Sequence, residues 1–316
     1  METVVCNLCG SDAYSLVYEK PDSRYFPQRF FKVVRCSRCG LGFVNPRPTS
    51  QEIWEYYPPV YYGDFQSKSN FRRYAAEAGY LKRVEDVPGP HRLLDIGCAN
   101  GDFPRFMKSR GWQVEGVEVS PASLQIDDFK VYRVPFPDIP VHDGRFDAVT
   151  AWAVLEHVHD PAAYFRKAAE VLRPGGLFVF LVTNFDSMIS RYLFGEDIPR
   201  HLYFFTEPTV RSYLAKVGLM FERSDYTNRV YSARPRFWLY FLISRIRKRG
   251  RTWPLPKDYV DFLREGSLER GLSSLIKWCF HSPFSALDYL LLPLLEQVQM
   301  LRRTYGNVVY VARRIE

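Results

Sequence analysis

Residues 93–101 read Leu-Leu-Asp-Ile-Gly-Cys-Ala-Asn-Gly, and this stretch decides the fold of the chain. An apolar run ends at Asp95, and glycines follow at positions 97 and 101. Glycine lets the backbone turn sharply and approach a ligand closely, so the pattern predicts a strand over 91–96 that turns into a helix over 101–111. Because ligands of open α/β sheets bind at the carboxyl ends of strands, we expect a binding loop here.

Strands and helices alternate on the carboxyl side of this loop. The expected strands cover 113–119, 130–134, 146–152, 177–183 and 219–226, and the expected helices cover 161–172 and 206–217. This alternation indicates an α/β fold, a mostly parallel sheet with helices on both faces. A last strand at 307–313 follows a helical stretch at 231–304, so we interpret that stretch as an insertion before the final strand.

The composition is that of an ordinary globular protein. The 316 residues are 47% hydrophobic and 25% charged, which is enough to build a core without disulfides. The net charge of +8 is compatible with nucleic acid, anionic lipid or a phosphorylated substrate and selects none of them. No apolar run approaches the ~20 residues that cross a bilayer, and the N-terminus lacks a signal-peptide pattern, so the cytoplasm is the expected compartment.

Four of the six cysteines form two Cys-x-x-Cys pairs. Cys6 and Cys9 precede Cys36 and Cys39 by 26 intervening residues, and a glycine follows each pair. Zinc prefers four thiolates in a tetrahedron, and two such pairs supply them. We expect a structural zinc site, because four protein ligands leave no open position for catalysis. An iron–sulfur site or unmetallated thiols are the alternatives.

An acidic residue follows the second expected strand at the distance that a nucleoside ligand requires. Glu118 lies 17 residues past Gly101, where it can accept hydrogen bonds from ribose hydroxyls. The glycine spacing is Gly-x-x-x-Gly, not the Gly-x-Gly-x-x-Gly that binds a pyrophosphate. The alternatives at this stage are a dinucleotide site and a turn that binds nothing.

The chain resembles the class I S-adenosylmethionine-dependent methyltransferases, and four motifs in the family's order carry this resemblance. They are the loop Asp95–Gly101 followed by Glu118, the strand 146–150 with Leu155-Glu156-His157 after it, the turn Arg173-Pro174-Gly175-Gly176, and the segment His201–Thr206, which is common in the ubiquinone-biosynthesis-like branch. The resemblance covers about 91–226 and the last strand. It implies a Rossmann-like seven-stranded methyltransferase sheet.

The resemblance also implies the residues that bind the cofactor. They are Asp95, Gly97, Cys98, Asn100, Gly101, Glu118, Val119, Asp138 and Trp152. Two positions depart from the family pattern. Ala99 stands where the family usually has glycine, and Asp138, the candidate for the adenine amine, is displaced by a proline-rich stretch.

Two histidines are the candidate catalytic residues. A hydroxyl or carbon acid must lose a proton to accept a methyl group, and histidine is the usual base near neutral pH. His157 follows the fourth expected strand and His201 follows the fifth, so both should lie on the rim that holds the acceptor. Either histidine could instead only fix its loop by hydrogen bonds.

These features divide the chain into five parts: a zinc-ribbon segment (1–48), a helical cap or linker (49–90), the methyltransferase core (91–230), the insertion (231–304) and the final core strand (305–316). The N-terminal segment resembles the zinc-binding N-terminus of bacterial methyltransferases that act in sugar or polysaccharide pathways. The insertion mixes aromatic residues with the basic run 245–251. It is typical of a cap over the acceptor site, or of a peripheral element at the inner face of a membrane.

The leading function is therefore transfer of a methyl group from S-adenosylmethionine to an oxygen or carbon of a small molecule. We expect this acceptor to be a sugar or a precursor of a polysaccharide or natural product, and it could be lipid-linked. An RNA methyltransferase is less favoured, because Thr150–Ala153 replaces the Asn- or Asp-Pro-Pro-Tyr/Phe motif of many nucleic-acid amino methylators. A non-catalytic zinc-ribbon binding module is the third alternative.

Overall fold

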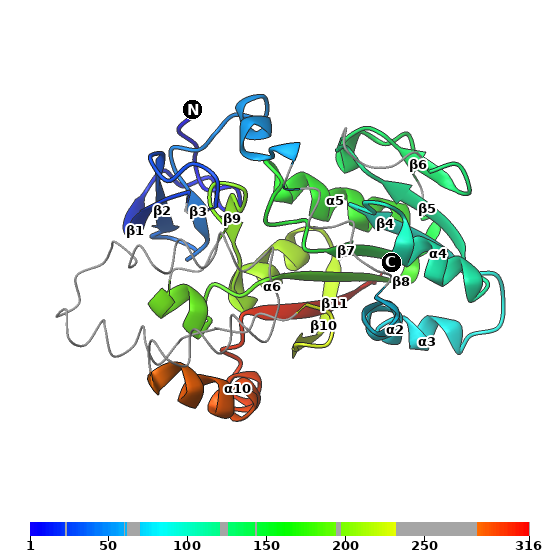
Figure 1. The fold of residues 1–316 in the computed structure, drawn as a ribbon. Helices are drawn as coiled ribbons and strands as arrows, with labels where there is room; N and C mark the ends of the chain where they lie inside the picture. The colour runs from blue at the N-terminus through cyan, green and yellow to red at the C-terminus, as the bar shows by residue number, and fades with distance from the viewer. Residues whose placement is uncertain are drawn as a thin grey trace.

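The structure, a computed structural model, describes residues 1–22, 24–59, 61, 70–120, 126–142, 144–193, 197–231 and 283–315. These residues build two sheets that lie side by side (Figure 1). The larger sheet has seven strands and forms the centre of the molecule. The smaller sheet has four strands and carries most of the N-terminal segment.

The central sheet has the order β10-β11-β8-β7-β4-β5-β6. Its strands are β4 (Arg92–Ile96), β5 (Gln113–Val117), β6 (Lys130–Tyr132), β7 (Phe146–Trp152), β8 (Leu172–Thr183), β10 (Leu219–Tyr226) and β11 (Asn307–Arg314). The strands from β6 to β8 pair in parallel, whereas β11 pairs antiparallel with both β8 and β10. The predicted seven-stranded α/β fold is confirmed. The last strand is not an edge strand but lies between two others.

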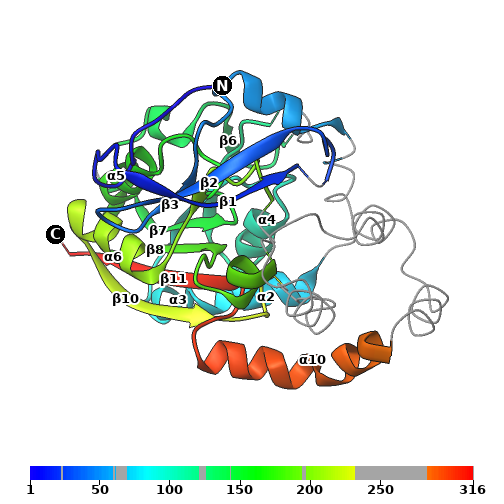
Figure 2. The same ribbon diagram turned by 90° about the vertical axis from the view of Figure 1, so that its left-hand side faces the viewer.

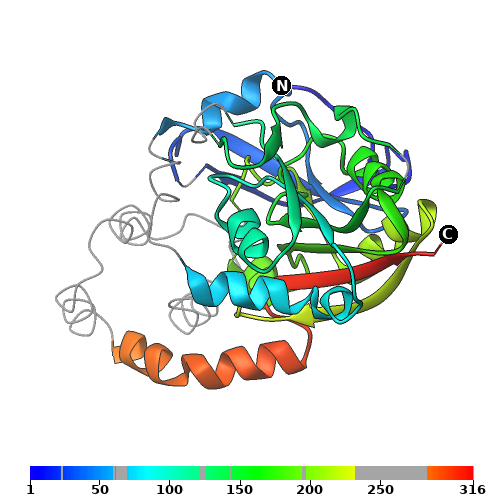
Figure 3. The same ribbon diagram turned by 90° about the vertical axis from the view of Figure 1, so that its right-hand side faces the viewer.

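Helices cover both faces of this sheet (Figures 1 and 3). One face packs against α5 (Pro161–Val171) and α6 (Glu207–Lys216), and the other packs against α2 (Phe71–Gly79), α3 (Lys82–Glu85) and α4 (Asp102–Ser109). Every residue of β7 is buried, as expected for a parallel strand that is covered on both sides.

Capping residues stabilise the N-termini of the two helices on the first face. The side chain of Asp160 accepts a hydrogen bond from the backbone of Ala163, and Pro161 occupies the first turn of α5. At α6, Thr206 and Thr209 form a reciprocal capping box.

The N-terminal sheet is completed by the core. Its order is β1 (Tyr14–Pro21), β2 (Phe30–Cys36), β3 (Gly42–Val44) and β9 (Tyr203–Phe204), and β9 belongs to the connection after β8 (Figure 1). Figure 2 shows β1, β2 and β3 side by side. A fully buried ion pair joins the two parts, because Arg200 donates to Asp22 at 2.8 and 3.0 Å. The N-terminal segment is thus bound to the connection that carries His201.

The inserted stretch between β10 and β11 is described only in part. Its helix α10 (Pro283–Leu301) lies on the outside of the molecule (Figures 2 and 3). Residues 232–282, which include the basic run 245–251, lie outside the described residues. Among the described helices, none is long and apolar enough to cross a membrane.

Candidate functional site

The loop between β4 and α4 turns through three residues with left-handed backbone. The φ angles are 69° at Gly97, 49° at Ala99 and 80° at Gly101, where α4 begins. At position 97 a Cβ atom would lie 2.6 Å from Cγ2 of Val154, so only glycine fits there. Ala99 adopts a conformation that costs an L-residue about 1–2 kcal/mol, which explains why glycine suits this position in other loops of this kind.

Two buried acids fix this loop. Asp95 at the end of β4 accepts a hydrogen bond of 2.6 Å from the hydroxyl of Thr150 on β7. Glu118 accepts one from the backbone N–H of Ala99 at 2.9 Å and one from that of Ser120 at 2.7 Å. Each oxygen of Glu118 has a second acceptor site, which leaves capacity for the hydroxyl of a ligand. The acid predicted to contact ribose therefore also holds the loop in shape.

Cys98 and Asn100 support the loop from within. The side chain of Cys98 is buried against Gly116 on β5, where a Cβ atom would approach its Sγ to 2.6 Å. The carbonyl oxygen of Asn100 accepts a hydrogen bond of 2.7 Å from Arg105 on α4. Both residues therefore shape the loop through packing and backbone contacts.

The other predicted cofactor residues lie around the same loop. Val119 is exposed directly after Glu118, and Asp138 is exposed at the end of the short helix η2 (Phe136–Asp138). Burial raises the pKa of Tyr164 to about 12, and the charges of Asp138 and Glu118 add to this rise. Asp138 and Glu118 therefore share one edge of the site.

Trp152 ends β7 beneath the helices of the second face. Its ring packs edge-on against Phe103 of α4, with 5.6 Å between centroids, and lies 6.2 Å from the ring of Tyr80. Its indole N–H is buried and meets no hydrogen-bond partner among the described residues. An unpartnered buried donor beside the glycine loop is typical of a site that a ligand completes.

The two candidate histidines come together after the ends of β7 and β8. Their rings are 4.6 Å apart and nearly perpendicular. The Nδ1 atom of His157 lies 3.0 Å from the hydroxyl of Tyr57, and the His157 ring also hydrogen-bonds to the backbone of Arg200. In contrast, Nδ1 of His201 is buried and has no hydrogen-bond partner among the described residues.

Burial keeps both histidines neutral. It lowers the pKa of His157 to about 4 and holds the pKa of His201 well below its usual value. The carboxylate of Asp197 acts in the opposite direction on both rings. Burial tends to raise the pKa of Asp197, but the charge of Arg200, which donates to it at 2.6 Å, holds that pKa well below its ordinary value. A neutral imidazole with an unpartnered nitrogen can accept a proton.

Glu156 lies next to this pair. It is fully buried, and burial raises its pKa to about 8. One ligand atom each from Glu156, His157 and His201 lie within 4.8 Å of one another, a spacing at which one metal ion could be held. The group thus has two chemical uses, either proton transfer or metal binding.

The four N-terminal cysteines converge as their spacing predicts. Their sulfur atoms all lie within 4.8 Å of one another, and the opposite pairs Cys6–Cys39 and Cys9–Cys36 are 3.4 and 3.5 Å apart. These distances are far longer than a disulfide bond and close to the ~3.8 Å between ligands of a tetrahedral zinc. Gly10 and Gly40 close the two knuckles with φ angles of 73° and 78°.

Comparison with known proteins decides the family of the core. Residues 67–223 match the family model described as methyltransferase domain. This part of the chain is a class I methyltransferase domain. A ubiquinone biosynthesis O-methyltransferase of Alkalilimnicola ehrlichii is 36% identical over 103 residues, which are 29% of this chain and 42% of that protein. The chain spans about half the length of the curated relatives it matches.

Solved structures share the fold of the methyltransferase domain. The [4+2]-cyclase SpnF superposes with a TM-score of 0.51 at 17% identity, covering 85% of this chain and 97% of that chain. A candidate sarcosine dimethylglycine methyltransferase from Galdieria sulphuraria gives 0.50 at 16% identity, covering 80% and 90%. At these identities the likeness concerns the fold alone, and the cyclase illustrates that this fold does not fix the reaction.

The structure reveals an incompletely bonded charge pair on α2 that the sequence motifs did not indicate. Arg73 and Glu77 of α2 lie over the glycine loop, and neither the Nε of Arg73 nor the carboxylate oxygens of Glu77 make a well-aligned hydrogen bond with described residues. The ring of Tyr231 packs under the guanidinium of Arg73, with 5.0 Å from Cζ to the ring centroid. All three residues lie outside the sequence motifs of the family. The one sequence signal for them was the Arg73–Glu77 charge pair in a short helix.

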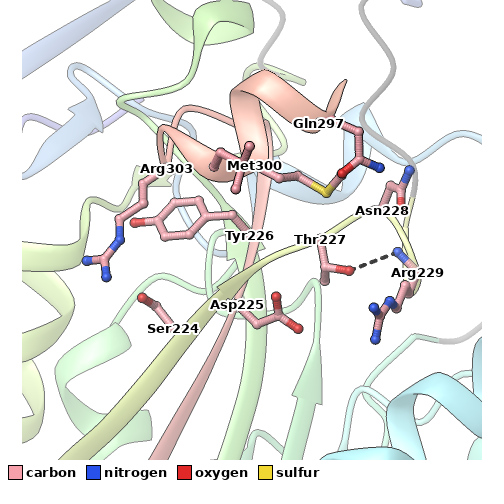
Figure 4. A pocket seen from close by; sticks show the side chains of 10 residues that line it. Ser224, Asp225, Tyr226, Thr227, Asn228, Arg229, Gln297, Met300 and Arg303 are labelled. Atoms are coloured by element: carbon pink, nitrogen blue, oxygen red, sulfur yellow. Dashed lines mark hydrogen bonds between the residues drawn. The ribbon is translucent and has the colours of Figure 1, made fainter. Parts of the chain in front are cut away.

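A separate groove lies between the end of β10 and the end of α10 (Figure 4). Its lining is largely polar and includes Asp225, Asn228, Arg229, Gln297 and Arg303. None of the predicted cofactor or catalytic residues lines it. The groove is therefore distinct from the loop of the methyltransferase domain.

Proposed function

We propose that this protein transfers a methyl group from S-adenosylmethionine to an oxygen or carbon of a small molecule, and that the acceptor is a sugar or a precursor of a polysaccharide or natural product. The observation that carries the proposal is the loop 97–101 with its left-handed backbone conformations. Glu118 accepts a hydrogen bond from this loop, and the hydrogen bond between Thr150 and Asp95 holds the strand end that precedes it. When bound there, the cofactor supplies an activated methyl on a sulfonium. The protein must orient the acceptor and exclude water.

His201 is the better candidate for the general base. Its Nδ1 meets no hydrogen-bond partner in the described part of the chain, whereas His157 hydrogen-bonds with Tyr57 and the Arg200 backbone. We assign His157 the role of holding the His201 ring by edge-to-face packing. The N-terminal sheet would then take part in catalysis indirectly, because Asp22 fixes Arg200 next to His201.

Two other functions stay open to test. A zinc-ribbon RNA methyltransferase would bind RNA with a steep dependence on salt, because phosphate contacts release counterions. A non-catalytic binding module would show no affinity for S-adenosylmethionine. The arrangement of Glu118 and the glycine loop supports a catalytic protein over the module.

We also propose that the four cysteines bind one structural zinc ion. The fit rests on the distances between their sulfur atoms and on the two glycine-closed knuckles. The ion would hold the segment that pairs through β3 with β9. A structural zinc in this place links the acceptor side of the site to the N-terminus.

For the insertion, we propose contact with an anionic membrane surface. The side chains of Leu287, Leu290, Leu294, Val298 and Leu301 on α10 are exposed, and their spacing of three or four residues places them on one stripe of the helix. The same insertion carries the basic run 245–251 in its sequence. Apolar side chains beside basic residues are the pattern of a helix that lies in a lipid interface. A cap over the acceptor site is the alternative.

Replacement of Glu118 by Ala should weaken binding of S-adenosylmethionine by about 10- to 100-fold, since hydrogen bonds to a charged group contribute about 1.5–3 kcal/mol. Isothermal titration calorimetry would measure this loss. The control is Glu222→Ala on β10, at the opposite edge of the sheet, which should bind normally. A wild-type protein without affinity for the cofactor would refute the methyltransferase proposal.

Replacement of His201 by Ala should lower turnover by about 10²–10⁴-fold with little change in cofactor affinity, because a general base contributes that much. His157→Ala should cost less. Release of S-adenosylhomocysteine, with an acceptor found by screening nucleotide sugars and lipid-linked sugars, gives the readout. His159→Gln is the matched control, because His159 lies two residues after His157 but its ring hydrogen-bonds to the Pro48 carbonyl. Unchanged turnover in both Ala variants would exclude a histidine base.

Elemental analysis should find about one zinc per chain, and Cys9→Ser should reduce this content and the thermal stability together, because metal binding is linked to folding. Cys98→Ser is the control, since Cys98 lies in the glycine loop and far from the cluster in sequence. A metal-free preparation that is as stable as the metal-loaded one would contradict the zinc proposal.

Flotation with vesicles of phosphatidylcholine and phosphatidylglycerol should recover the protein at low salt, and high salt should reduce the bound fraction because it screens the basic residues. The double variant Leu290→Ser and Leu294→Ser should reduce binding several-fold. Leu16→Ser, which changes an exposed leucine of β1, serves as the control. Failure to float at low salt would leave the cap as the role of the insertion.

A further inference from the structure

Glu77 is a buried acid whose surroundings are incomplete. Its side chain is 1% exposed, and both carboxylate oxygens lack a well-aligned hydrogen bond among the described residues. In the part of the chain that the structure describes, its ion-pair partner is Arg73, whose Nε lies 3.2 Å away outside hydrogen-bond geometry and makes no other hydrogen bond there. Leaving a buried carboxylate without hydrogen bonds is costly, so this arrangement indicates that a ligand completes it.

The place of Glu77 in the fold points to the ligand. Successive residues of a strand face opposite sides of the sheet, so Asp95 on β4 and Trp152 on β7 share the face that packs against α2 and α4. Asp95 is close enough to raise the pKa of Glu77, and its charge is the next influence there after burial and Arg73. Glu77 therefore faces the sheet near Asp95, where the glycine loop begins. The indole N–H of Trp152, which has no hydrogen-bond partner among the described residues, lies on the same face.

The hydroxyl of Tyr74, one turn before Glu77, fixes α2 in this position. It donates a hydrogen bond of 3.1 Å to Asp102 in the first turn of α4. The helix that carries the unsatisfied charges is thus fastened to the helix that begins at the glycine loop. A ligand bound in the loop would meet these charges without a rearrangement of α2.

We propose that Glu77 binds the ammonium group at the amino-acid end of S-adenosylmethionine, with Arg73 facing the carboxylate of the same group. The amino-acid end is a zwitterion, and a buried carboxylate beside a half-buried guanidinium is its complement in charge. Glu118 and Asp138 lie at the other side of the loop, where the nucleoside is expected. This inference rests on the proposed function, because it concerns the cofactor of that reaction.

Ligands that carry or lack this end test the proposal. S-adenosylmethionine and S-adenosylhomocysteine both carry the amino-acid group, whereas 5′-methylthioadenosine lacks it. Glu77→Gln should weaken binding of the first two by about 10- to 100-fold and leave the affinity for 5′-methylthioadenosine within about twofold, as measured by calorimetry. Glu77→Asp, which keeps the charge, should recover part of the affinity for S-adenosylhomocysteine.

The outcomes separate the two proposals. Equal weakening of all three ligands, or no weakening, would show that Glu77 only supports the helix and would overturn this inference. A wild-type protein that binds none of the three would instead refute the proposed function. Glu85→Gln on α3, where the carboxylate already bonds Arg110 and Trp112, is the control and should bind all three normally. If Glu77→Gln does not fold, Glu77→Asp carries the comparison of the three ligands.

A dependence on pH gives a second readout. The groups that face Glu77 are Arg73 and Tyr74 of α2, Asp95 of β4, Asp102 through Tyr74, and Tyr231. Burial raises the pKa of Glu77 to about 8, and its charged form is the one that binds an ammonium group. Affinity for S-adenosylhomocysteine should therefore rise between pH 6.5 and 8 in the wild-type protein. In Glu77→Gln this rise should be smaller, and an identical rise in both proteins would contradict the contact.

Discussion

The carboxylate of Glu118 accepts a hydrogen bond from the backbone amide of Ala99, and the shape of the site depends on this contact. The loop must turn through left-handed conformations at three positions, and one of these holds alanine. A loop with that strain stays in place only because the surrounding groups determine it from several sides. Val154 closes over Gly97, and the Asp95–Thr150 bond fixes the strand end below.

The positions of α2, α4 and the two histidines follow from the position of this loop. Helix α4 begins at Gly101, and Tyr74 fastens α2 to its first turn, so the charges of α2 lie over the loop. On the neighbouring strands, the ends of β7 and β8 bring His157 and His201 together at the rim. One side of the sheet's edge thus presents groups suited to a cofactor, and the other presents groups suited to an acceptor.

The N-terminal segment is joined to the connection that carries His201 and is not a separate appendage. Its sheet takes β9 from the connection after β8, and the buried pair of Asp22 and Arg200 ties the two together next to His201. A buried pair of this kind is weak evidence for stability, but it specifies geometry when both partners are fully enclosed. The cysteine cluster therefore lies where a structural ion could hold the acceptor wall.

The sequence by itself determined the strands and helices of the core, the glycine loop with Glu118, and the clustering of the four N-terminal cysteines. Each of these features depends on local spacing or on a motif of a few residues. Only the tertiary structure decided which residues from other parts of the chain surround this loop. It placed β11 between two other strands, brought His201 against His157, and set Glu77 over a loop that lies 20 residues away in sequence. Such contacts depend on how the strands order themselves and on which helix covers which face. These choices arise from packing of the whole chain, and no short segment encodes them.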